Sequence, residues 1–98
     1  MARINWTHEA QTWLRDIFDY IARDNPRAAA RVIEGIYERT QILIRFPQLG
    51  HRYEGISDRD MRILLYGHYR IAYLVKSEEE IDILGVFHGA LDIQRYLV

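Results

Sequence analysis

The 98-residue sequence contains no cysteine, one lysine and two prolines. Because cysteine is absent, the chain cannot form disulfides, use a thiol as a nucleophile or hold zinc through thiolates. No apolar run approaches the roughly 18 residues that a membrane-spanning helix needs, and the first residues lack an apolar stretch of signal-peptide length. These absences predict a cytoplasmic protein that has no contact with a membrane.

An excess of charge of either sign is also missing, since 13 basic residues face 14 acidic ones and the formal net charge is −1. The chain therefore has no general attraction to nucleic acid. Its composition, 49% hydrophobic and 28% charged, is typical of soluble globular proteins and excludes general disorder. A chain of this length suits a single domain, which we expect to span residues 1–98.

The basic residues are unusual in kind and in position. Lys76 is the only lysine, so the other 12 basic residues are arginines, whose planar guanidinium groups suit carboxylates and phosphates. Between Arg27 and Arg70 there are eight arginines and five acidic residues, which is a local excess of three positive charges. This segment is either a solubilising surface or a surface that attracts an acidic partner.

The first part of the chain predicts a strand and a helix. Residues 2–6 alternate between apolar and polar side chains, as a short, half-buried strand does. Thr7 then offers a hydroxyl group as the cap of a helix. Apolar residues follow at helical intervals of three and four, at Ala10, Trp13, Leu14, Ile17, Phe18 and Ile21.

A second helix should follow after a short interruption. Asn25 suits its cap and Pro26 its first position, and we expect it to continue until Pro47 and Gly50 stop it. Because the connection is short, the two helices should form an antiparallel hairpin. Residues 48–60 are polar, include two glycines and predict a loop.

The remaining pattern is that of strands. Residues 61–66 and 69–75 are rich in aliphatic and aromatic side chains, and Gly67-His68 between them favours a type II′ hairpin turn. A further strand is predicted at residues 81–87. The expected order is β-α-α-β-β-β, and the fold class is α+β, with the helical hairpin packed on one face of a small, twisted, mainly antiparallel sheet.

A two-residue turn also predicts which side chains share a face of the hairpin. Residue 66 should lie opposite 69, residue 64 opposite 71, and residue 62 opposite 73. One face would carry Arg62, Leu64 and Ile71, and the other Arg70, Leu65 and Leu74. Arg62 and Arg70 would then point to opposite sides, which disfavours a phosphate clamp made of both, and we expect Arg62 to pair with a carboxylate at the edge of the sheet.

Both faces of this hairpin are apolar, which is unusual for a sheet with one side open to water. The helices can cover only one face. Either a segment of a partner or the chain's own tail, residues 90–98, should cover the other, and the sequence does not choose between them.

Several short motifs follow one another along the chain: Phe46-Pro47 followed by Leu49-Gly50, Arg62 opening a strand, Tyr69-Arg70-Ile71 with Tyr73 on the next strand, and Val86 with His88 on the last. In this order and spacing they resemble the RelE/ParE superfamily of bacterial toxins over nearly the whole chain. The resemblance implies a toxin of a type II toxin–antitoxin module, held inactive by an antitoxin whose partly disordered segment folds onto it. One branch of the superfamily cleaves mRNA on the ribosome, and the ParE-like branch blocks DNA gyrase.

The last strand favours the ParE-like branch. Ribonuclease-like members place additional basic residues there and just after it, whereas residues 86–92 contain none and the next is Arg95. We therefore expect a gyrase inhibitor rather than an enzyme. The alternative is a ribosome-dependent mRNA endonuclease with Arg70 as phosphate clamp, His88 as acid or base and Tyr96 as a stacking or proton-donating group. A third alternative is a chain that has lost toxicity and retains only antitoxin binding.

The expected partners are a cognate antitoxin, in a hetero-oligomer with the toxin, and DNA gyrase, or the ribosome and mRNA in the alternative. The resemblance and the hairpin pattern together give the predicted antitoxin-binding residues: Leu64, Leu65, Ile71, Leu74, Arg62 and Arg70. Leu64 with Ile71, or Leu65 with Leu74, should form the groove, depending on which pair is turned from the helices. No cofactor or metal is expected, because the four histidines are scattered and no phosphate-binding loop is present.

Overall fold

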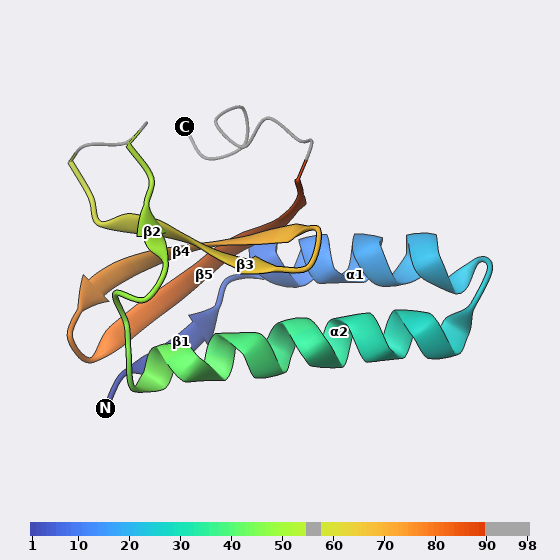
Figure 1. The fold of residues 1–98 in the computed structure, drawn as a ribbon, viewed down its shortest axis with the longest axis horizontal. Coiled ribbons are helices and arrows are strands. Elements are labelled where there is room, and N and C mark those ends of the chain that lie inside the picture. Colours follow the sequence, from blue (N-terminus) through green and yellow to red (C-terminus); the bar gives the residue numbers. More distant parts are fainter. Residues whose placement is uncertain (55–57, 90–98) are drawn as a thin grey trace.

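Two helices lie side by side on one face of a five-stranded sheet in the computed structural model, which describes residues 1–54 and 58–89 (Figure 1). The elements in chain order are β1 (Arg3–Trp6), α1 (His8–Ala22), α2 (Pro26–Thr40), the 3₁₀ helix η1 (Gln41–Ile44), β2 (His51–Arg52), β3 (Met61–Tyr66), β4 (Tyr69–Ser77) and β5 (Glu80–His88). This order confirms the predicted α+β class. No helix within the described ranges is both long and apolar enough to cross a membrane.

Side-chain caps begin both helices where the sequence predicts them. The Thr7 hydroxyl accepts a hydrogen bond from the Ala10 amide at 3.2 Å, and the Asn25 side-chain oxygen accepts one from the Ala28 amide at 3.1 Å. Pro26 occupies the first turn of α2, where no amide hydrogen is needed. These caps satisfy backbone donors that a helix terminus leaves without intrahelical partners.

The second helix is shorter than predicted, because α2 ends at Thr40 instead of continuing to Pro47. The Thr40 hydroxyl donates to the Tyr37 carbonyl at 2.6 Å, which is the acceptor that an α-helix would offer to the Gln41 amide. The Gln41 amide bonds to the Glu38 carbonyl instead. From Gln41 the chain forms η1, a tightening that is frequent at the ends of helices.

The strand order in the sheet is β1-β5-β4-β3-β2, with β1 parallel to β5 and all other neighbours antiparallel. Strand β2 corrects the prediction of an uninterrupted loop over residues 48–60. It consists of two residues, His51 and Arg52, that pair with Ile63 and Arg62. A strand this short has no alternation to detect and forms only because β3 is there to pair with it.

The hairpin of β3 and β4 has the predicted register: Arg62 lies opposite Tyr73, Leu64 opposite Ile71, and Tyr66 opposite Tyr69. Gly67 has φ +56°, and no other described residue has a positive φ. This combination fits a type II′ turn, in which only the first central residue needs that conformation.

The main core lies between the sheet and the helices. Strand β5 packs against α1, and β3 packs against α2. The fully buried side chains of this helix-side cluster include Ile36, Leu43, Ile71, Tyr73, Ile81, Ile83 and Val86. A smaller cluster of Ile63, Ala72 and Phe87 lies on the other face of the sheet, which we call the far face, and Trp13 packs against both clusters.

Candidate functional site

The Tyr73 hydroxyl connects the sheet to the segment that follows η1. Tyr73 is fully buried, and its hydroxyl accepts a hydrogen bond from the Gly50 amide at 2.8 Å and donates one to the Pro47 carbonyl at 2.9 Å. Gly50 must approach this closely, because a Cβ at that position would lie 2.7 Å from the Ile63 carbonyl oxygen and 2.8 Å from the Tyr73 ring. The segment around the Phe46-Pro47 and Leu49-Gly50 motif is therefore fixed to the sheet.

Arg62 holds the same segment from the neighbouring strand. Its Nε donates to Asp60 Oδ1 at 2.9 Å, and its Nη1 donates to the carbonyls of Gln48 at 3.0 Å and Gly50 at 2.9 Å. The predicted pairing of Arg62 with a carboxylate is confirmed. We call the hydrogen bonds of Tyr73 and Arg62 to residues 47–50 the loop clamp.

The far face carries Leu65 and Leu74, one of the two pairs predicted to form the antitoxin groove, but the centre of this face is buried, because Met61, Ile63, Ala72 and Phe87 are at most 2% exposed. The tail, residues 90–98, which was the alternative cover for this face, lies outside the described residues. In the hairpin register, Leu65 lies opposite Arg70 and Leu74 opposite Met61, on the side turned from the helices. Leu65 is 53% exposed and Leu74 is half-buried. Leu64 and Ile71 lie under the helices in the helix-side cluster, so they serve the core rather than a binding surface.

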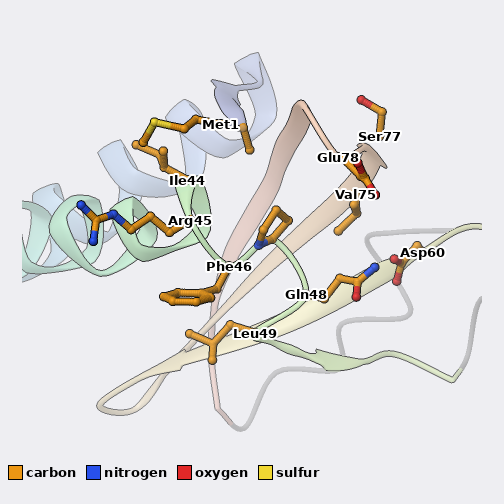
Figure 2. A pocket seen from close by; sticks show the side chains of 12 residues that line it. Met1, Ile44, Arg45, Phe46, Gln48, Leu49, Asp60, Val75, Ser77 and Glu78 are labelled. Atoms are coloured by element: carbon orange, nitrogen blue, oxygen red, sulfur yellow. The ribbon is translucent and has the colours of Figure 1, made fainter.

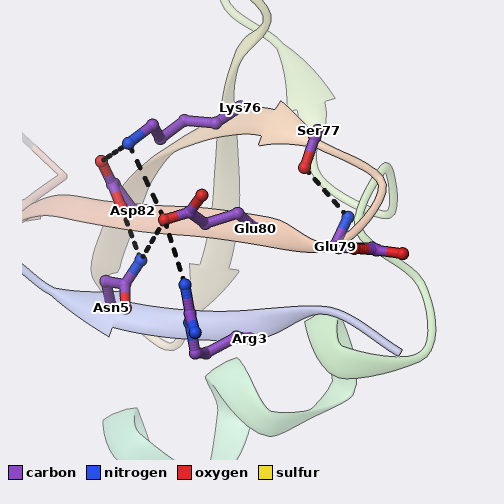
Figure 3. Close-up of polar contacts among 7 residues, drawn as sticks. All are labelled: Arg3, Asn5, Lys76, Ser77, Glu79, Glu80 and Asp82. Carbon is purple, nitrogen blue, oxygen red and sulfur yellow. Dashed lines mark hydrogen bonds and ion pairs between the residues drawn. The ribbon is translucent and has the colours of Figure 1, made fainter.

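The opposite end of the far face is polar and neutralises its own charges (Figure 3). Asn5 Nδ2 donates to Glu80 at 3.2 Å and to Asp82 at 3.1 Å, and Lys76 Nζ lies 3.8 Å and 3.7 Å from the same two carboxylates. Arg3 adds a contact of 3.5 Å to Glu80. The far face thus has a polar end near β1, where opposite charges are paired, and a mainly apolar end at β3 and β4, where Leu65 lies opposite Arg70.

The candidate catalytic residues do not come together. Arg70 lies opposite Phe87 of the far-face cluster, whereas His88 lies opposite Tyr69, and adjacent positions of a strand point to opposite faces. The His88 ring is stacked on the His68 ring, with 6.3 Å between the ring centroids. It meets the Tyr69 ring edge-on, with 5.9 Å between the centroids. Tyr96 lies outside the described residues.

Elsewhere in the described ranges, no group of three or more acidic or histidine residues is arranged to hold a metal ion.

A groove beside η1 is a feature that the sequence did not predict (Figure 2). It has a volume of about 1160 Å³ and is lined by Met1, Ala2, Ile44, Arg45, Phe46, Pro47, Gln48, Leu49, Asp60, Val75, Ser77 and Glu78. The only sequence signal for it was the Phe46-Pro47 and Leu49-Gly50 motif, whose apolar side chains turn out to be exposed.

Comparison with known proteins gives consistent matches. Residues 4–93 match the family described as the ParE toxin of the type II toxin–antitoxin system parDE. The protein Y4kP of Sinorhizobium fredii (strain NBRC 101917 / NGR234), which is described as a candidate toxin, is 35% identical over 87 residues, covering 89% of this chain and 88% of Y4kP. A chain from the structure of a chromosomal ParDE toxin–antitoxin system of P. aeruginosa superposes with a TM-score of 0.74 at 25% identity, covering 90% of this chain and 96% of that one.

The loop clamp predicts a specific cost for removing one hydroxyl. Tyr73→Phe leaves the Gly50 amide and the Pro47 carbonyl without their partner in a buried place, so we expect a loss of about 1–3 kcal/mol in the free energy of unfolding. Urea denaturation of both proteins measures it. Tyr37→Phe is the matched control, because Tyr37 is 52% exposed and should change stability by less than about 0.5 kcal/mol. Equal effects at the two tyrosines would contradict the clamp.

The same hydroxyl predicts a dependence on alkaline pH. Burial raises the pKa of Tyr73 above its ordinary value of 10.0, an effect that the Gly50 hydrogen bond opposes. As the pH rises past that ordinary value, the unfolded chain loses this proton first, so the native state loses stability. Tyr73→Phe lacks the group, and the stability difference between the two proteins should narrow above about pH 10. Urea titrations across this range measure the difference in the free energy of unfolding between the two proteins. A difference that stays constant or widens as the pH rises would contradict a raised pKa of Tyr73.

Proposed function

The chain belongs to the ParE toxin family of type II toxin–antitoxin systems, and we propose that a cognate antitoxin neutralises it and that the free chain inhibits DNA gyrase. The observation that carries the antitoxin proposal is the apolar end of the far face, where Leu65 is 53% exposed beside buried Ile63 and Ala72. Leu65 follows this buried cluster on the same face of the sheet, so a partner segment that covers Leu65 would continue the apolar packing of the far face.

The distribution of charge supports an acidic segment in the antitoxin. Several arginines are exposed and form no ion pair within the described ranges: Arg27, Arg31, Arg45, Arg52 and Arg59. The acidic side chains of β5, in contrast, are already matched by Lys76, Arg3 and Asn5. An acidic segment would be attracted to the arginines, which raises the rate of encounter more than the affinity.

Gyrase inhibition is supported over mRNA cleavage by the arrangement of the candidate catalytic groups. A phosphate clamp and a proton-transferring group must meet at one scissile bond, within hydrogen-bond reach of the reacting atoms. Arg70 and His88 belong to opposite faces of the sheet. Arg62, a second cation that could bind phosphate, is engaged in the loop clamp.

We expect the purified chain to inhibit supercoiling by bacterial DNA gyrase and to cause cleaved DNA to accumulate, and the added antitoxin should reverse both effects. The antitoxin to use is the cognate one, which we expect to be encoded by a small reading frame beside this gene. Arg70→Ala should inhibit gyrase as the unchanged chain does, within about threefold, because no phosphate clamp is involved. Cuts at fixed codon positions in transcripts, with gyrase unaffected and the cuts lost in Arg70→Ala, would establish the nuclease instead.

The far-face site has a separate test in antitoxin affinity. Leu65→Asp places a charge in the apolar contact, and we expect the dissociation constant of the antitoxin complex to rise about tenfold or more. Tyr20→Asp on α1 is the control, because Tyr20 is 74% exposed and lies on the helix side of the sheet, where it lines a cavity with Tyr69 and His88. Isothermal titration measures both. An unchanged affinity in Leu65→Asp would remove the far face from the antitoxin site.

A further inference from the structure

A cavity of about 520 Å³ lies between α1 and the helix side of the sheet. It shares no lining residue with the groove beside η1 and lies at the other end of β4, where that strand begins at Tyr69. A volume of this size is typical of sites for small molecules. The side chains that line it come from α1, β4 and β5: Trp13, Asp16, Ile17, Tyr20, Ile21, Tyr69, Val86 and His88.

Helical periodicity and strand register together place these side chains around one space. The lining positions of α1, at 13, 16, 17, 20 and 21, follow the helical intervals of three and four and form one stripe. On the sheet, Tyr69 lies opposite His88, and Val86 is two residues from His88 on the same face. The ends of β4 and β5 therefore supply the wall that faces α1.

The cavity has an apolar floor and a polar mouth. Val86 is fully buried and belongs to the helix-side cluster. Asp16 and His88 are exposed, and Tyr20 is 74% exposed. The ring contacts of His88 with His68 and Tyr69 hold that side of the mouth in place. A ligand can therefore enter from solvent and place an apolar part inside.

The residues of the mouth favour a positively charged ligand. Asp16 is the acidic residue of the lining, and it forms no ion pair within residues 1–54 and 58–89. No lysine or arginine lines the cavity, whereas Tyr20 and Tyr69 bring phenol rings to it. The faces of aromatic rings attract cations, and a carboxylate beside them adds an ionic hydrogen-bond acceptor.

We propose that this cavity binds a small organic cation, whose amidinium, guanidinium or ammonium group pairs with Asp16 and whose ring or short apolar body packs against Tyr20 and Tyr69. The ligand is a free molecule rather than a basic side chain of a partner protein, because a body the size of a ring fills this volume better than the narrow stem of one arginine or lysine. The inference is separate from the proposed function, since it requires neither antitoxin nor gyrase.

A ligand in this place would join α1 to the sheet. Asp16 and Tyr20 belong to α1 and Tyr69 belongs to β4, so a molecule that contacts all three bridges the helical layer and the strands. The cavity exists only in the folded chain. The ligand should therefore raise the melting temperature of the chain as its concentration increases.

The test uses benzamidine, a benzene ring that carries an amidinium group, and benzamide as its neutral counterpart. The indole N–H signals of the isotope-labelled chain in nuclear magnetic resonance spectra report the location, because Trp13 lines the cavity and Trp6 does not. We expect benzamidine to shift the Trp13 signal saturably without moving that of Trp6, and benzamide to bind about tenfold more weakly. Trp6→Phe assigns the two signals.

Two aspartates of α1 provide a matched pair of variants. Asp16→Asn keeps the shape of the side chain and removes its charge, so benzamidine should bind about tenfold more weakly while the affinity for benzamide is unchanged. Asp19→Asn is the control, because Asp19 is exposed on the same helix but does not line the cavity. It should leave both affinities unchanged. Circular dichroism and thermal melting establish that each variant is folded.

Several results would overturn the inference. Equal affinities for benzamidine and benzamide, or equal effects of Asp16→Asn and Asp19→Asn, would show that the cavity does not select a cation. The absence of a saturable shift at Trp13 would show that the probe does not enter it. If benzamidine binds only after Arg95→Gln, the chain's own residues 90–98 supply the cation, and a site for a free ligand is excluded. Antitoxin binding and gyrase inhibition are measured with other partners, so the proposed function stands or fails separately.

Discussion

The structure depends on the hydrogen bonds that the Tyr73 hydroxyl and the Arg62 guanidinium make to the backbone of residues 47–50. Neutral hydrogen bonds of this kind contribute about 1 kcal/mol each, and those from a charged donor contribute more. They fasten the end of the helical layer to the central strands. They also bring His51 and Arg52 next to β3, where they pair as β2, and they place Phe46 and Leu49 at the surface.

The surfaces around this clamp differ in polarity: one end of the far face carries paired charges, and other places expose apolar side chains. The acidic residues of β5 are neutralised by neighbours on β1 and β4, so the polar end of the far face needs no partner. On the far face Leu65 is exposed beside the buried side chains of Ile63, Ala72 and Phe87, and beside η1 the side chains of Phe46 and Leu49 are exposed. Several exposed arginines between residues 27 and 59 form no ion pair within the described ranges.

The parts of the fold that local chemistry determines could be predicted from the sequence. Thr7 and Asn25 cap the helices within three residues of their own positions, and the two-residue turn at Gly67-His68 sets the whole hairpin register, including the separation of Arg62 from Arg70. The parts that depend on distant contacts could not. The partners of Tyr73 are 23 and 26 residues away, and β2 exists only because β3 is beside it. The groove was missed for the same reason, because η1, the N-terminus and the β4–β5 turn meet only in three dimensions.

The central claim is that an antitoxin covers Leu65 at the apolar end of the far face. Hydroxyl-radical footprinting of the free chain and of its complex measures the solvent exposure of individual side chains. Oxidation of Leu65 should be fast in the free chain and suppressed in the complex, while that of Tyr20 should not change. Unchanged oxidation at Leu65, with protection of Tyr20 instead, would place the antitoxin on the helices and contradict the account.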